Sequence, residues 1–527
     1  MDSRKTGAWR LLAPLVPIAA FWILNARALR SWWMTDDPCL LGAALQRGLL
    51  THFYDPETWR ALSGTVLMPW TPFSLGLDHA FFGLEPRFFY AHQLLSFSLL
   101  LVLGYLVLRT FAGRLAAAGA LTVFAVSAPS FAVASQLMNR HYLEGLVLAL
   151  AAYLCFRRAV LKDRRLWAVL GAVLYALAMT AKEVFVPLVV LLPLVPLGSW
   201  RQRWIQALPF AAAAALYLPW RIYMLGWANI LAGYLPSGQS AGPGHVLAMA
   251  ALDAPWRLAA LGFVALAVLI VLRRNRPALI LGAAAVVVLV LPLLRLSALM
   301  VAPRHFFLPA LAAAMLLAAA LQGLPRRVAV PVVLVLCGLT LNNLLATPIW
   351  RGYDTQRDRY RVEGEVILKQ DKGVLLTRLQ DTQYLRCLAE IRQDTEIEST
   401  GATFCGDGCW CSDQPGLELW RIEDGVLQSA TPVTACAEKR PLNVDLRYDR
   451  ARGRLAWSFG PWNEGRWHVL LVTEHGTSIP VPLVASGEIS ITLAAGLRTV
   501  VRYTSPEGWQ TYSPALDPTA GEVWQRP

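Results

Sequence analysis

Two adjacent carboxylates, Asp36 and Asp37, stand in the stretch WWMTDDP, residues 32–38. A positioned carboxylate can take a proton from an acceptor hydroxyl or amine as a general base, and paired carboxylates can hold a divalent cation. The alternative is structural, because an aspartate directly before Pro38 suits the start of the helix that the spacing predicts over 40–50. One aspartate can cap this helix while the other reacts.

Two pairs of residues at the ends of apolar blocks carry cations that can bind phosphate. Lys182-Glu183 lies between two such blocks, where ionisable residues are costly and usually functional. Arg304-His305 opens a later block, and arginine holds phosphate through a planar fork of donors. The structural alternatives are a helix-end ion pair for the first and interfacial anchoring for the second.

A third candidate, Arg140-His141, lies in a tight turn between apolar blocks, with Glu144 one helical turn further on. The i,i+4 spacing allows Arg140 to pair with Glu144, and an unpaired carboxylate there would be expensive. A structural ion pair and a substrate contact fit this pattern equally well. Asp55 and Glu57 are weaker candidates, since solvated loop charges explain them.

These residues are embedded in a membrane protein. The chain has 527 residues, of which 56% are hydrophobic and only 16% charged, against roughly 25% charged in soluble domains. Apolar blocks long enough to cross a bilayer fill the chain as far as residue 350. They predict about eleven spans, near 9–30, 91–109, 115–136, 138–157, 166–181, 184–198, 204–224, 256–272, 277–295, 305–323 and 328–349.

Alternate loops between these spans carry the positive charge, which fixes an orientation by the positive-inside rule. Three long segments, 31–90, 225–255 and 351–527, then fall on the outer side, and the N-terminus is cytoplasmic. The net charge of +13 therefore resides mostly in short loops and does not indicate a nucleic-acid partner. No small-residue cleavage site follows the apolar block 11–29, since Ser31-Trp32-Trp33 is a poor one, so we expect a retained first span.

Six of the eight cysteines fall on the outer side by this topology: Cys39, Cys387, Cys405, Cys409, Cys411 and Cys436. An even number in an oxidising compartment favours disulfides, although six cysteines allow 15 pairings. A zinc site at Cys405, Cys409 and Cys411 is the weaker alternative, because the spacing is unusual and no histidine is near.

The polypeptide divides by composition into a transmembrane part, 1–350, a mixed part, 351–415, and a period-two part, 416–527. Dense aromatic residues in 31–90 favour short amphipathic helices at the outer surface. The mixed part contains a predicted helix over 381–392. The last part predicts a β-sandwich, with strands at 417–422, 442–448, 455–459, 467–473, 489–493 and 499–503. It holds no enzyme-like motif and suits an accessory module.

The transmembrane part resembles the GT-C superfamily of membrane glycosyltransferases, most of all the protein O-mannosyltransferase and lipid A aminoarabinose transferase group. Four features carry the resemblance: the pair Asp36-Asp37 after the first span, the aromatic outer loop, the stretch TAKEV at 180–184 and the stretch RHFFLP at 304–309. It does not extend to the β-rich part. In this group the acidic motif is usually Asp followed by Glu, whereas here Asp37 is followed by Pro38.

The resemblance implies a polyprenyl-phosphate sugar donor and inversion at the sugar carbon. One of Asp36 and Asp37 would be the base, with Mg²⁺ or Mn²⁺ at the pair left open. Lys182, Arg304 and His305, with Arg140, would neutralise the leaving lipid phosphate, and the supporting residues would be Glu183, Glu144 and His141.

The implied function is transfer of a sugar to a protein, lipid or glycan acceptor in the periplasm, by an enzyme of the bacterial inner membrane. The alternatives are a flippase or transporter of a lipid-linked sugar, an O-antigen ligase or polymerase, and a non-enzymatic envelope scaffold. Transporters often show internal repeats and charges at the midplane, and neither feature is evident here. A ligase would use a large outer loop between late spans, and a scaffold leaves the clustered charges unexplained.

Overall fold

A computed structural model describes most of the chain, residues 13–527 outside the following gaps: 64–65, 228–275, 292, 294–301, 370–373, 377–381, 395–402, 413–418, 424–425, 430–437, 439, 450–453, 474–475, 479, 491–496 and 522. The backbone divides into two compact units. The membrane unit comprises Met1–Trp32 and Ala43–Asp354, and the C-terminal unit comprises Trp33–Gly42 and Thr355–Pro527. The boundary at Asp354 lies close to the predicted one, but residues 33–42 group with the C-terminal unit.

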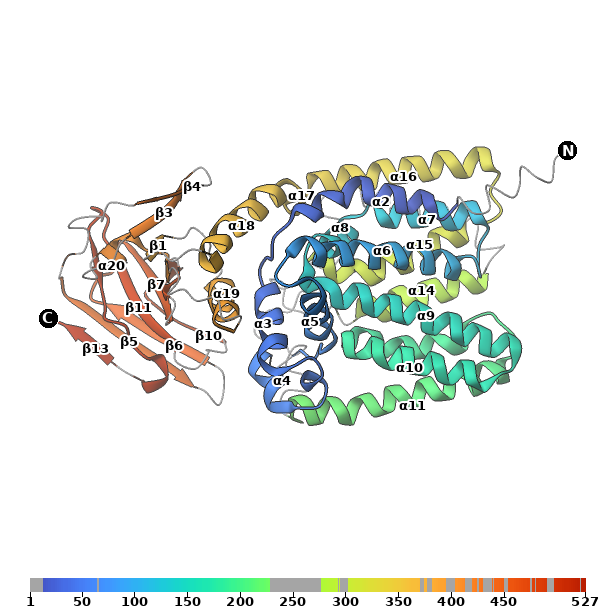
Figure 1. Cartoon of the computed structure of the whole chain (residues 1–527), viewed down its shortest axis with the longest axis horizontal. Helices are drawn as coiled ribbons and strands as arrows, with labels where there is room; N and C mark the ends of the chain where they lie inside the picture. Colours follow the sequence, from blue (N-terminus) through green and yellow to red (C-terminus); the bar gives the residue numbers. More distant parts are fainter. Residues whose placement is uncertain are drawn as a thin grey trace. The chain divides into compact units, whose positions relative to one another are not determined.

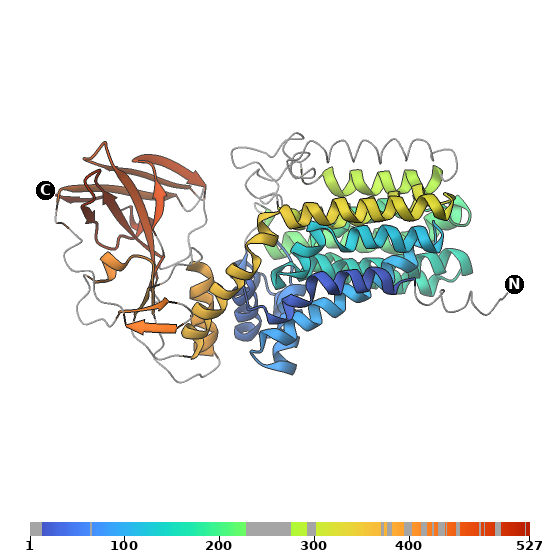
Figure 2. The ribbon, with the colours of Figure 1, turned by 90° about the horizontal axis from the view of Figure 1, so that it is seen from above.

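The long helices of the membrane unit run side by side along one direction (Figures 1 and 2). In chain order the described helices are α2 (Leu15–Asn25), η1 (Ala26–Arg30), α3 (Asp37–Arg47), η2 (Thr51–Phe53), α4 (Pro56–Leu62), α5 (Trp70–Phe82), α6 (Pro86–Leu108), α7 (Arg114–Ala125), α8 (Ala128–Ala134), η3 (Leu137–Asn139), α9 (Arg140–Lys162), α10 (Arg165–Ala181), η4 (Glu183–Leu194), α11 (Trp200–Leu225), α14 (Arg276–Val290), η9 (Pro303–Phe306), α15 (Phe307–Leu321), α16 (Arg326–Ala346) and α17 (Pro348–Arg351).

Four described helices, α6, α11, η9 with α15, and α16, are long and apolar enough to cross a membrane. The pair α7 and α8, bent by 65°, makes a fifth when it is counted as one span. The chain is therefore a multi-pass membrane protein. Every predicted span in the described part coincides with a helix or helix pair, whereas 256–272 lies outside the described residues. Span 184–198 is a 3₁₀ helix, η4, which contains Pro187 and Pro193; proline removes the backbone donor that an α-helix needs.

Local sequence sets several helix ends. Ser199 and Gln202 form a capping box at the start of α11, and Gly226, with φ of 83°, follows its end. The outer loop 31–90 contains α3, α4 and α5, which agrees with the predicted short helices. Asp55 caps α4 by accepting from the Glu57 N–H at 3.1 Å. The Thr58 hydroxyl donates to the same carboxylate at 2.5 Å, and this bond lowers the pKa of Asp55.

The C-terminal unit contains two sheets that enclose a core. One is a mixed sheet of nine strands in the order β12-β11-β7-β8-β2-β1-β3-β4, with β9 paired to β7, and the other has the order β10-β6-β5-β13. The helices of this unit are α18 (Tyr353–Lys369), α19 (Thr382–Asp394), α20 (Gly408–Ser412) and η10 (Pro518–Ala520). The strands are β1 (Val374–Leu376), β2 (Thr403–Cys405), β3 (Leu419–Glu423), β4 (Val426–Ser429), β5 (Leu442–Asp449), β6 (Arg454–Gly460), β7 (Arg466–Thr473), β8 (Gly476–Thr477), β9 (Val481–Leu483), β10 (Ser486–Ser490), β11 (Arg498–Thr504), β12 (Gln510–Tyr512) and β13 (Val523–Arg526).

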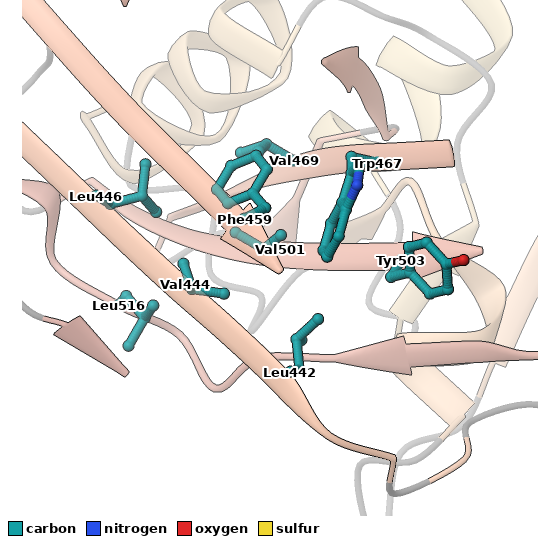
Figure 3. Packing of buried hydrophobic residues seen from close by; sticks show 9 residues of the cluster. All are labelled: Leu442, Val444, Leu446, Phe459, Trp467, Val469, Val501, Tyr503 and Leu516. Carbon is teal, nitrogen blue, oxygen red and sulfur yellow. The ribbon is translucent and has the colours of Figure 1, made fainter. Parts of the chain in front are cut away.

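Alternate residues of β5, β7 and β11 point into one apolar cluster between the sheets (Figure 3). On β5 these are Leu442, Val444 and Leu446, as the period-two pattern predicts. The predicted helix 381–392 is present as α19. The predicted division at residue 415 is not a structural boundary, because β1 and β2 join the same sheet as β3, with β1 parallel to both.

A disulfide-closed loop covers the other face of the larger sheet. Cys405 and Cys411 are bonded to each other, and Trp410 packs on Leu470 and Val500. The prediction of disulfides is confirmed for Cys39, Cys387, Cys405, Cys409 and Cys411, while Cys436 lies outside the described residues. The zinc alternative is wrong for Cys405 and Cys411, because their sulfurs are consumed in the bond.

The C-terminal unit should lose stability in mild acid through His468 on β7. Burial, with Arg502 and Arg466 nearby, lowers the pKa of His468 below 6.5. The unfolded chain therefore binds the proton more readily, and this contribution to stability is complete above pH 6.5 and lost below it. Amide hydrogen exchange in β7 and β11, corrected for the intrinsic exchange rate, should be faster at about pH 5.5 than at about pH 7.5. The substitution His468→Gln should reduce this difference in exchange rate. His79→Gln is the control, and an unchanged difference in His468→Gln contradicts the assignment.

Candidate functional site

The two aspartates occupy one turn of the C-terminal unit but have opposite exposures. Asp37 is 0% exposed, whereas Asp36 is exposed. The Asp37 carboxylate accepts the Met34 N–H at 2.9 Å, and the Asp37 N–H donates to the Met34 carbonyl at 3.1 Å. Thr35 between them has φ of 51°, a conformation that β-branched residues rarely adopt. Asp37 therefore holds the turn that starts α3, and Asp36 presents its side chain to solvent.

The predicted cations Lys182 and Arg304 lie near each other in the membrane unit. Lys182 follows α10, and Arg304 lies in η9 at the start of α15. Both interact electrostatically with the His141 ring, and with each other. The Lys182 ammonium lies 5.8 Å from the centroid of the Tyr142 ring. Three separate helices thus bring together residues that are far apart in sequence.

A carboxylate and a further arginine complete this group. Glu183 Oε2 lies 3.8 Å from an Nη atom of Arg221 on α11, and their side chains are 11% and 5% exposed. Arg221 also interacts electrostatically with Lys182. Sequence reasoning missed Arg221, although an arginine inside the apolar span 204–224 was the available signal.

Charge in this group is not balanced by the carboxylates that the structure describes. Lys182 and Arg304 are half-buried, and neither has an ion-pair partner among the described residues. Asp253 is the sole acidic residue in the sequence from 226 to 302. We name the group of Lys182, Glu183, Arg221, Arg304, His141 and His305 the cation cluster.

Two histidines line the cation cluster. His141 is 4% exposed, and its ring lies within hydrogen-bond reach of the Met138 backbone. His305 Nδ1 accepts the Ala302 N–H at 2.9 Å, which leaves Nε2 as the donor of a neutral ring. The Tyr142 ring lies between them, with centroids 4.3 Å from His141 and 6.2 Å from His305.

Arg140 is placed differently from the predicted phosphate contact. Its side chain is 0% exposed. The guanidinium donates to Asp78 at 2.6 Å, to Ser74 at 3.2 Å, to Gln93 at 3.3 Å and to the Phe89 carbonyl at 2.9 Å. These four acceptors occupy it, so we assign Arg140 to the structural alternative.

Glu144 belongs to the same network. Its carboxylate lies 3.5 Å from Arg140 Nε, as the i,i+4 spacing predicted. It accepts from the Trp70 indole at 2.6 Å and from the Ser74 hydroxyl at 2.9 Å, which ties α5 to α9. His92 Nδ1 donates to the Asp78 carboxylate at 2.7 Å at the edge of the network. Asp78 and His92 were missed, because nothing in their local sequence marks them as partners of Arg140.

An apolar cavity of about 170 Å³ lies among the helices that carry the cation cluster. Leu308, Leu311, Ala312 and Met315 of α15 line it. Leu308 is one helical turn from Arg304, and the other three continue along the same helix face. Leu146 on α9, one turn beyond Tyr142, also lines it, together with residues of α6, η4 and α14.

The described residues contain no group of three or more His, Cys, Asp or Glu side chains arranged to hold a metal ion. Two aspartates supply hard oxygen ligands of the kind that Mg²⁺ accepts beside water and a substrate phosphate. The divalent cation at Asp36 and Asp37 stays a prediction.

Comparisons with known proteins find similarity in solved structures alone. No family model and no curated protein matches the sequence. The structure of ArnT from Cupriavidus metallidurans in the apo state is 15% identical, covers 76% of this chain and 86% of its own, and gives a TM-score of 0.47. The same protein bound to undecaprenyl phosphate is 16% identical, covers 73% and 75%, and gives 0.41. ArnT is a lipid A aminoarabinose transferase, from the group that the sequence resemblance named.

The Arg140 network predicts a large loss of stability when the arginine is removed. Arg140→Ala leaves Asp78 and Glu144 buried without their cation, which should cost about 3–5 kcal/mol and lower the midpoint of thermal unfolding in detergent. Arg164→Ala, at an exposed position of the same chain, is the matched control. Equal midpoints for the two variants would contradict the role of Arg140.

Proposed function

We propose that the chain is a glycosyltransferase that moves a sugar from a polyprenyl-phosphate carrier to an acceptor on the periplasmic face of the bacterial inner membrane. The observation that carries the proposal is the cation cluster, in which three cations face one carboxylate at the end of apolar helices. Such a group needs an anion, because unbalanced charge in an apolar environment is costly. A lipid phosphate supplies both the anion and the apolar chain.

The cavity supports a lipid as the source of that phosphate. Its lining continues along α15 from the turn after Arg304, and along α9 from the turn after Tyr142. A polyprenyl chain entering this cavity would place its phosphate toward Lys182 and Arg304. A free phosphate or a sugar nucleotide would gain nothing from an apolar cavity at this position.

The reaction we propose forms a bond from an acceptor oxygen or nitrogen to the anomeric carbon and breaks the bond from that carbon to the phosphate oxygen. Asp36 takes the acceptor proton as general base, and its exposure suits this role better than the buried Asp37 does. Lys182 and Arg304 stabilise the negative charge that develops on the leaving polyprenyl phosphate. Inversion at the anomeric carbon follows from this single displacement.

The remaining cluster residues position these cations. Glu183 and Arg221 pair beside Lys182, and His305 caps the turn that carries Arg304. The His141 ring is buried beside the same site. Arg140 and Glu144 hold α5 against α9 and do not contact the donor in this proposal.

Removing either cation should weaken binding of undecaprenyl phosphate. A hydrogen bond to a charged group contributes about 1.5–3 kcal/mol, so Lys182→Ala and Arg304→Ala should each raise the Kd about 10- to 100-fold. Binding is measured with purified protein in nanodiscs. Arg326→Ala, at an exposed position on α16, is the matched control. Wild-type affinity for undecaprenyl phosphate in both variants would contradict the assignment of Lys182 and Arg304 to a phosphate site.

Asp36→Asn should abolish transfer without abolishing donor binding, because loss of a general base costs about 10²- to 10⁴-fold in rate. Envelope glycans are compared by mass spectrometry in strains with the gene deleted, restored or carrying Asp36→Asn, at equal protein level. A sugar mass lost on deletion and restored by the intact gene, but not by the variant, identifies what is transferred. Full restoration by both Asp36→Asn and the Asp36→Ala/Asp37→Ala double variant would point to a flippase or scaffold instead.

A further inference from the structure

A disulfide fastens the aspartate turn to the C-terminal unit. Cys39 lies three residues after Asp36, in the first turn of α3, and is bonded to Cys387 in α19. Their Cα atoms are 4.9 Å apart, although 348 residues separate them in sequence. Both side chains are buried, at 7% and 3% exposure.

Packing continues from the disulfide for one further turn of both helices. A Cβ atom added to Gly42, three residues after Cys39, would lie 3.4 Å from the Ile391 side chain, four residues after Cys387. Ile391 is 0% exposed. The start of α3 is thus held against α19 by a covalent bond and by close packing at the next turn.

The turn before α3 needs such a support. Thr35, directly before Asp36, has φ of 51°, and a β-branched residue keeps this conformation only where its surroundings enforce it. The Asp37 carboxylate closes the turn from one side through the Met34 N–H. The Cys39–Cys387 disulfide fixes the other side of this turn, within four residues of the proposed base.

We propose that Cys39 and Cys387 are positioning residues, and that their disulfide sets the position of Asp36 for transfer. This inference rests on the proposed function. It makes activity depend on oxidation of one named pair, in which two thiols lose two electrons and two protons to the disulfide-forming machinery of an oxidising compartment. The C-terminal unit then takes part in catalysis as the support of the base.

The test compares two disulfide deletions in the intact protein. Cys39→Ser/Cys387→Ser removes the proposed tether, and Cys405→Ser/Cys411→Ser removes another disulfide of the same unit as the matched control. Each variant is assayed for the glycan product in cells and for binding of undecaprenyl phosphate in nanodiscs. We expect at least a tenfold loss of product for the first variant, with its Kd within about twofold of wild type, and normal product for the control.

Reduction of folded wild-type protein provides the second arm, which also serves if the double variant does not accumulate. Purified enzyme is treated with a phosphine reductant and alkylated, and mass spectrometry identifies the opened pair. Transfer should fall as Cys39 and Cys387 become labelled and should return on reoxidation of unalkylated protein. The free thiols Cys155 and Cys337 provide an internal standard for labelling.

The outcomes separate the two proposals. Wild-type product from the tether variant, or undiminished transfer after Cys39 and Cys387 are labelled, would overturn the positioning role while the proposed function stands. Parallel loss of donor binding and product would also overturn it, since it would indicate general damage. Absence of any product from the wild-type gene would mean that the proposed function itself had failed.

Discussion

The membrane unit depends on one electrostatic constraint, which is that a charge among apolar helices must meet an opposite charge or a hydrogen-bonding group. Two neighbouring sites meet this constraint in different ways. Arg140 belongs to one of them and His141, the next residue of the same helix, belongs to the other. Around Arg140, Asp78 and Glu144 compensate the guanidinium within the protein. In the cation cluster the described carboxylates leave positive charge in excess. Among the residues that the structure describes, the first site is therefore compensated and the second is not.

The cations of the two sites differ in their environment. Arg140 is fully buried and donates to four protein acceptors, so any ligand would have to displace bonds that hold α5 and α9 together. Lys182 and Arg304 are half-buried and make no ion pair with described residues, so a bound phosphate would break no ion pair that the structure describes. The same residue types in similar sequence positions therefore have different surroundings.

Much of the fold was predictable from the sequence. Bilayer thickness sets the length of the apolar blocks, and a half-buried strand requires apolar residues at every second position. The cation cluster was partly predictable, since Lys182 and Arg304 break the positive-inside pattern at span ends. The pairing of Asp78 with Arg140 was not predictable, because the two residues are 62 positions apart in the sequence. The Cys39–Cys387 disulfide was not predictable either, since cysteine spacing fits many connectivities. The bend between α7 and α8 was also missed, because a hydropathy window averages over it.

Cysteine chemistry links the position of the aspartates to the side of the membrane on which transfer would occur. The described disulfides lie in segments assigned to the outer side, whereas the free thiols Cys155 and Cys337 lie in helices α9 and α16. Residues 33–42 belong to the C-terminal unit, and the Cys39–Cys387 bond is part of what joins them to it. A base carried on this segment would reach its final position only after oxidation. Transfer would then be confined to protein that has been exported and oxidised, on the face where a periplasmic acceptor is met.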